Sequence, residues 1–70
     1  MDFAEAILDL RTVLRISQEQ LAKELDVSYA TINRWENGRT LPNRMTINAI
    51  KHYCEKRSLE FTYESVKNTV

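Results

Sequence analysis

The feature that most constrains the fold of this chain is a pair of short helical patterns separated by a very short turn, in residues 17–38. The first pattern opens at Ser17, which forms a capping-box pattern with Gln20: the hydroxyl accepts a hydrogen bond from a free backbone N–H, and the amide reaches back to the cap. Apolar residues then recur at helical spacing, at Leu21, Ala22 and Leu25. We therefore expect a helix that begins at Gln18.

The second pattern follows almost at once. Ser28 is a further N-cap candidate, with its side-chain oxygen placed to accept a hydrogen bond from Ala30 or Thr31. A helix is expected from near Tyr29 to just before Gly38, since glycine adopts the left-handed conformation that ends helices at little cost. Its apolar residues are Ile32 and Trp35. Two helices joined by three or four turn residues must cross sharply, so residues 17–38 are predicted to form a helix-turn-helix.

Longer helical patterns flank this unit. Asp2 and Glu5 match a capping box and predict a helix over about Phe3–Arg15, whose apolar face is Phe3, Ala6, Ile7, Leu10 and Leu14. Pro42 forces an extended residue before it, so a loop is expected there. Asn43 then caps a helix to about residue 57, whose buried stripe is Ile47, Ile50 and Cys54. The predicted fold class is all-α, a compact bundle of four or five helices.

Composition limits the possible functions. Seventy residues with 43% apolar content make one small domain with a modest core. No apolar run approaches the length of a membrane span, so we expect a cytoplasmic protein that does not contact a membrane. The single Cys54 permits no internal disulfide, and His52 has no second histidine or acid–thiol set near it. We expect no catalytic residues, no metal and no cofactor.

Charge is distributed unevenly although the net charge is zero. Residues 1–10 hold three acids and no base, whereas residues 11–57 hold nine bases and five acids, which leaves +4 in the middle of the chain. Taken alone, this asymmetry fits either a cationic face or ordinary solvated charge.

The C-terminal residues follow a different pattern. From Leu59 to Glu64, apolar and polar residues alternate with the period of a half-buried strand. A single strand needs a partner, so this segment either pairs with a second copy of the protein or packs as an extended tail, and a short fifth helix over Tyr63–Asn68 is the alternative. We divide the chain into a helix-turn-helix domain, residues 1–57, and a tail, residues 58–70, that is a possible dimerisation element.

Residues 11–43, RTVLRISQEQLAKELDVSYATINRWENGRTLPN, resemble the helix-turn-helix of phage repressor and Cro proteins, a group of xenobiotic-response-element type. The resemblance implies a lambda-repressor-like bundle that binds operator DNA, commonly as a homodimer. It also implies a small residue at Ala22, where the two helices cross. At Asp26 relatives usually carry glycine, because the turn often requires positive φ; aspartate tolerates that conformation better than most side chains.

The resemblance assigns site residues as well. The recognition helix, about Tyr29–Asn37, is expected in the major groove, with Ile32 and Trp35 facing inward. Base-reading residues would be Tyr29, Ala30, Asn33 and Arg34. Phosphate-contacting residues would be Ser17, Gln18, Ser28, Thr31, Asn37, Arg39, Thr40 and Arg44. In relatives an acid at the position of Glu36 pairs with an arginine of the first helix, so an ion pair between Arg11 and Glu36 is expected.

The predicted function is sequence-specific binding of double-stranded DNA by a small transcriptional regulator, a repressor. The alternative is a protein-interaction module, such as an antitoxin or an adaptor that docks a protein partner, which the zero net charge and the apolar tail favour.

Overall fold

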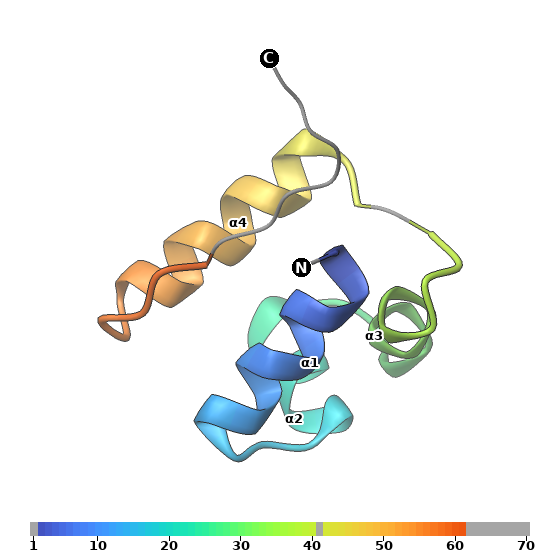
Figure 1. Ribbon diagram of the computed structural model, residues 1–70, viewed down its shortest axis with the longest axis horizontal. Helices are drawn as coiled ribbons and strands as arrows, with labels where there is room; N and C mark the ends of the chain where they lie inside the picture. The colour runs from blue at the N-terminus through green and yellow to red at the C-terminus, as the bar shows by residue number, and fades with distance from the viewer. Residues whose placement is uncertain (1, 41, 62–70) are drawn as a thin grey trace.

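The computed structural model describes residues 2–40 and 42–61, which contain four α-helices and no β-strand within those ranges. The helices are α1 (Phe3–Leu14), α2 (Gln18–Leu25), α3 (Tyr29–Glu36) and α4 (Arg44–Glu55) (Figure 1). The predicted all-α bundle is confirmed. The predicted helix starts agree with these bounds, and α1 and α4 end one and two residues earlier than expected.

Each helix begins at a side chain that accepts a hydrogen bond from the backbone three residues on. The caps are Asp2, Ser17, Ser28 and Asn43. At α1 the capping box is complete, because the Glu5 carboxylate also accepts from the Asp2 N–H at 3.3 Å. The capping box predicted at α2 is only half formed. The Ser17 hydroxyl accepts from the Gln20 N–H, but the Gln20 side chain does not bond back to the Ser17 N–H, so that part of the prediction is wrong. The Gln20 amide donates instead to the Glu24 carboxylate one turn on, at 2.7 Å, where the acceptor carries a charge and the bond is stronger.

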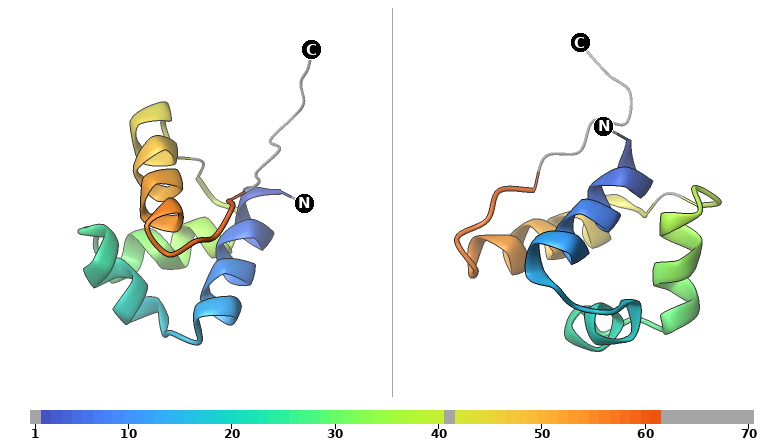
Figure 2. Two further views of the ribbon diagram at one scale, coloured as in Figure 1. Left: turned by 90° about the vertical axis from the view of Figure 1, so that its left-hand side faces the viewer. Right: turned by 60° about the horizontal axis from the view of Figure 1, so that its bottom comes forward.

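The helices pack around one core. α3 contacts both α1 and α2, and α4 contacts α2. In the right-hand view of Figure 2, α2 is seen nearly end-on while α3 lies along the page, so the two helices cross as the short turn requires. The buried side chains come from all four helices: Phe3, Ala6, Ile7, Leu10, Leu21, Ala22, Ile32, Trp35, Ile50, Tyr53 and Cys54. The Phe3 and Trp35 rings meet edge to face at 5.5 Å, which ties α1 to α3.

After α4 the chain turns back along the domain. Ser58 takes a left-handed conformation (φ 58°), and the Leu59 N–H donates to the Cys54 carbonyl at 2.9 Å. Leu59 and Phe61 consequently pack against the core, with the Phe61 ring 6.3 Å from that of Phe3. The rest of the predicted strand and the alternative helix at Tyr63–Asn68 lie outside the described residues.

No helix within the described residues has the length and apolar character needed to cross a membrane.

Candidate nucleic-acid interface

The turn between α2 and α3 depends on a residue with positive φ. Asp26 has φ 62° and ψ 43°, the left-handed conformation that glycine adopts more readily than other residues. This geometry lets the following N–H, that of Val27, donate to the Ala22 carbonyl at 2.9 Å. The turn thus satisfies the end of α2 while directing the chain into the Ser28 cap of α3.

α3 has two distinct faces. Ile32 and Trp35 are buried, at 0% and 5% exposure, and hold the helix against α1 and α2. On the outward face Tyr29, Ala30 and Arg34 are exposed, and Asn33 is partly exposed. The four residues predicted to read bases therefore share a surface that the fold leaves uncovered.

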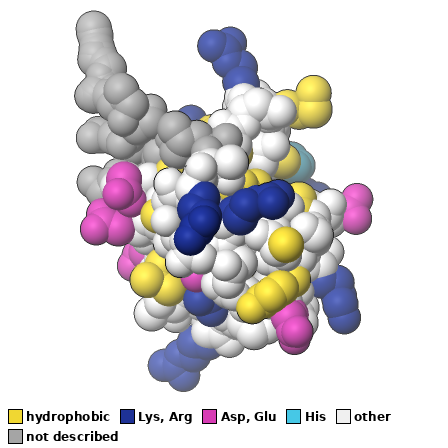
Figure 3. All heavy atoms as spheres, turned by 90° about the vertical axis from the view of Figure 1, so that its right-hand side faces the viewer, with side chains coloured by type: hydrophobic (Ala, Val, Ile, Leu, Met, Phe, Trp, Pro, Cys, Tyr) yellow, Lys and Arg dark blue, Asp and Glu magenta, His cyan; other side chains and the backbone are white. Residues whose placement is uncertain are grey.

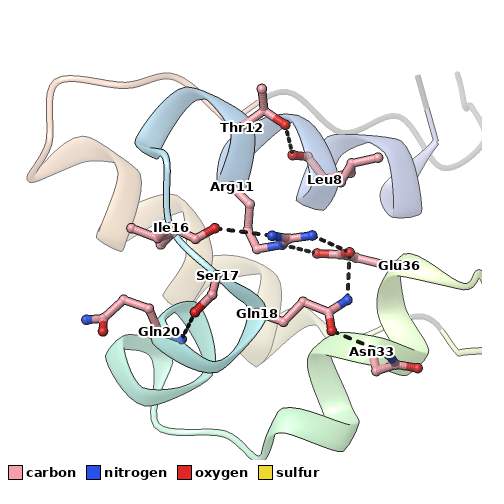
Figure 4. A network of polar contacts seen from close by, with 9 residues as sticks. All are labelled: Leu8, Arg11, Thr12, Ile16, Ser17, Gln18, Gln20, Asn33 and Glu36. Atoms are coloured by element: carbon pink, nitrogen blue, oxygen red, sulfur yellow. Dashed lines mark hydrogen bonds and ion pairs between the residues drawn. The ribbon is translucent and has the colours of Figure 1, made fainter.

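A polar network fixes α3 to α1 and α2. The Arg11 guanidinium donates to both carboxylate oxygens of Glu36, from Nε to Oε2 at 2.6 Å and from Nη2 to Oε1 at 3.0 Å. Its Nη1 donates to the Ile16 carbonyl at 3.1 Å, and the Gln18 amide donates to Glu36 Oε1 at 2.8 Å (Figure 4). Bidentate pairing of this kind is both strong and geometrically specific.

The ion pair neutralises a negative charge at the end of α3. An unpaired carboxylate there would repel a DNA phosphate, but the Glu36 charge is balanced by Arg11. Although burial raises the pKa of Glu36, the hydrogen bonds from Arg11 and Gln18 outweigh it and hold that pKa below its ordinary value. The hydrogen bond with Glu36 likewise raises the pKa of Arg11.

The network continues onto the outward face of α3, which the sequence patterns did not indicate. The Gln18 Oε1 accepts a hydrogen bond from Asn33 Nδ2 at 3.4 Å, and Asn33 Oδ1 accepts one from Asn37 Nδ2 at 2.7 Å. The resemblance assigns Gln18 and Asn37 to phosphates and Asn33 to bases, whereas the fold joins all three in one network. Since a side-chain amide carries two N–H donors, each of the three still has one available for DNA.

The remaining predicted phosphate contacts come from the caps of α2 and α3, from α3 itself, from the loop after it and from the start of α4. Ser17 and Ser28 are exposed caps, and the hydroxyls of Ser28 and Thr31 lie 2.9 Å apart in a mutual hydrogen bond. Arg39, Thr40 and Arg44 are exposed on the loop after α3 and at the start of α4.

The charge on this side of the molecule suits an anionic ligand. Figure 3 views the molecule from the side on which α3 lies, and shows Lys and Arg side chains near the middle of the face and around its rim. Acidic side chains lie mainly towards its edges. In the parts of the chain that are described, no group of three or more His, Cys, Asp and Glu side chains is placed to hold a metal ion.

Comparison with known proteins agrees with this geometry. Residues 7–61 match the family model described as helix-turn-helix. The chain belongs to the helix-turn-helix family. This helix-turn-helix chain is 40% identical over 53 residues to the HTH-type transcriptional activator BcrR of Enterococcus faecalis, an alignment that covers 76% of this chain and 26% of the relative. The chain thus spans about a quarter of the length of that curated relative. No solved structure matches it.

A second cluster, which joins α2 to α4, was missed at the sequence level. The Tyr53 hydroxyl donates to the Glu24 carboxylate, and the Arg57 guanidinium stacks over the Tyr53 ring at 3.7 Å. Burial and the hydrogen bond to Glu24 raise the pKa of Tyr53 to about 12. The only signal was the place of Tyr53 on the buried stripe of α4, because contacts between residues so far apart leave no periodic pattern.

Proposed function

We propose that this protein binds double-stranded operator DNA in a sequence-specific manner, with α3 in the major groove, and regulates transcription from the bound site. The two-faced character of α3 carries the proposal. Its apolar residues are fixed in the core, and its reading face of Tyr29, Ala30, Asn33 and Arg34 is left exposed.

Each reading residue has chemistry that suits base edges. The Arg34 guanidinium can donate two hydrogen bonds to guanine O6 and N7, and the Asn33 amide can pair with adenine. Tyr29 and Ala30 can contact a thymine methyl group. The Asn33 amide is held by Gln18 and Asn37, so it would meet the base with little loss of side-chain entropy.

The surrounding residues would hold the duplex in register. Hydroxyl, amide and basic groups that contact phosphate position a protein without reading sequence. On this proposal that set is Ser17, Gln18, Ser28, Thr31, Asn37, Arg39, Thr40 and Arg44. A protein with this role acts in the cytoplasm, beside the DNA.

We further propose that the protein binds as a homodimer and represses. A domain of this size spans one half-site, so two copies would match a palindromic operator. Repression needs only that the bound dimer covers a promoter. A reporter gene whose transcription rises with the protein would contradict repression. The assay is needed because the relative BcrR is a transcriptional activator.

The contribution of the tail to dimerisation can be tested without damage to the core. Truncation after Phe61 keeps both packed residues, Leu59 and Phe61, and removes only residues 62–70. Analytical ultracentrifugation with operator DNA measures the number of protein copies per duplex, which should fall from two to one in the truncated protein. An unchanged stoichiometry would exclude residues 62–70 as the dimerisation element.

The decisive experiment for DNA binding is selection from randomised duplexes with the whole protein. Recovery of one motif, with binding that weakens as salt rises by about 0.9 in log K per phosphate contact, supports the proposal. The motif also reports the half-site spacing. A selection that recovers no motif would favour the alternative, a protein-docking module such as an antitoxin or adaptor.

A further inference from the structure

A second surface of the molecule has the properties of a protein-docking site. A shallow groove runs between α1 and the returning segment 59–61, and is lined by Ala6, Asp9, Leu10, Val13, Leu59, Glu60 and Phe61. It lies away from the recognition helix. In Figure 1, α1 lies between the segment on the left and α3 on the right. In the left-hand view of Figure 2 the segment is in front and α3 is behind it.

The groove combines an apolar floor with an acidic rim. Val13 is 55% exposed at the groove, and Leu8 of the same helix is also largely exposed, so α1 presents apolar surface to solvent. Asp9 and Glu60 are exposed at the rim, and among residues 2–40 and 42–61 neither carboxylate has an ion pair or hydrogen bond. Lys51 lines an adjoining hollow together with Glu55 and with Glu60 itself, but it forms an ion pair with neither carboxylate.

The size of the hollow limits what can enter it. Its volume is about 60 Å³. An apolar cavity of about 150 Å³ holds a benzene molecule. The hollow is smaller than that cavity and is open to solvent, so it suits a single aliphatic side chain.

Charge decides the class of occupant. DNA is excluded because its phosphates would face two unpaired carboxylates. A second copy related by two-fold symmetry is disfavoured, since it would bring the same acids against one another. A segment with a lysine or arginine beside an aliphatic residue complements both the rim and the floor.

We propose that the groove between α1 and residues 59–61 docks a basic amphipathic segment of a partner protein. One aliphatic side chain enters the hollow, and basic side chains pair with Asp9 and Glu60. Because the groove and α3 lie on different sides of the molecule, the partner and DNA can be bound together. The proposal does not depend on DNA binding.

The test uses two synthetic amphipathic peptides that share leucine positions, one with lysine and one with glutamate on the polar face. Amide chemical shifts of the labelled protein are followed as each peptide is added. The lysine peptide should shift signals of Asp9, Val13 and residues 59–61, and the glutamate peptide should not. Absence of binding by the lysine peptide, shifts centred elsewhere, or equal binding of both peptides would overturn the proposal.

Variants identify the rim charge. D9K should weaken the lysine peptide about tenfold, since it replaces an attraction with a like-charge contact. The matched control is E19K, which reverses an exposed acid on α2 outside the groove and should leave the affinity unchanged. Both positions are exposed, so unchanged melting temperatures are expected and rule out misfolding. If the natural protein associates with itself and D9K does not, the groove binds a second copy of the protein, and the proposal is overturned.

Discussion

Arg11 and Glu36 lie 25 residues apart in the sequence and form a bidentate ion pair, with the guanidinium Nε 2.6 Å from the carboxylate Oε2. The exposed fractions of the two side chains are 20% and 11%, so water screens the pair only in part. The pair joins α1 to the end of α3, and so helps to set the orientation of the proposed reading face.

Removal of one partner should be costly. R11M leaves the Glu36 carboxylate partly buried without its cation, and we expect a loss of about 2–3 kcal/mol in the free energy of unfolding, between the values for exposed and buried pairs. E36Q should cost a similar amount. A double-mutant cycle in urea measures the coupling. Additive single losses would show that the pair contributes no interaction energy.

Asp26 should tolerate glycine and not valine. At φ 62° a β-branched side chain is strained by roughly 1–2 kcal/mol, whereas glycine adopts this conformation freely. D26V should therefore lower the denaturant midpoint markedly, and D26G should match or exceed the natural protein. K23V, at an exposed helical position on α2, is the control for β-branching alone. Equal losses in D26V and K23V would contradict strain in the turn.

The crossing of α2 with its neighbours should reject a larger side chain at Ala22. The residue is 4% exposed within the core, so A22L must displace packed atoms and is expected to cost about 1–3 kcal/mol. A49L places the same side chain at an exposed position of α4 and should be nearly neutral. Equal melting temperatures for A22L and A49L would show that the core has room for a larger side chain at Ala22.

Alkaline pH should destabilise the protein through Tyr53. Its pKa is raised from 10.0 to about 12 in the fold, so the folded state holds the phenolic proton more tightly than the unfolded state. The contribution of Tyr53 to the free energy of unfolding is complete below pH 10 and is lost as the pH rises from about 10 to about 12. Y53F should cost about 1–2 kcal/mol at neutral pH, because Glu24 loses a hydrogen bond, and should flatten the alkaline loss. An identical pH profile for Y53F would exclude Tyr53 as the source.

Much of the fold was predictable because its signals are local. The caps at Asp2, Ser17, Ser28 and Asn43 follow from side-chain type and position, and so do the buried Ile32 and Trp35. The positive φ of Asp26 was expected only from the resemblance, since nothing in the residue itself requires it. The matching conformation of Arg15, φ 59°, had no such guide.

The contacts that were missed are those in which one group chooses among several partners. The Gln20 side chain could turn back to accept from the Ser17 N–H or reach forward to donate to the Glu24 carboxylate, and in the fold it donates to Glu24. Gln18 was assigned to phosphate from the resemblance, yet in the fold it also joins Glu36 to Asn33. Such choices depend on where helices distant in sequence meet, which periodicity does not encode. The contacts of the site residues with DNA stay predictions.

The central claim is that α3 reads base sequence, and one comparison tests it most directly. The affinities of the natural protein, R34A and R39A are measured for the selected duplex and for a scrambled one across a range of salt concentrations. R34A should lose about 1–3 kcal/mol on the selected duplex and much less on the scrambled one. R39A should weaken both alike and reduce the salt slope by about 1. Equal losses for R34A on the two duplexes would contradict the claim.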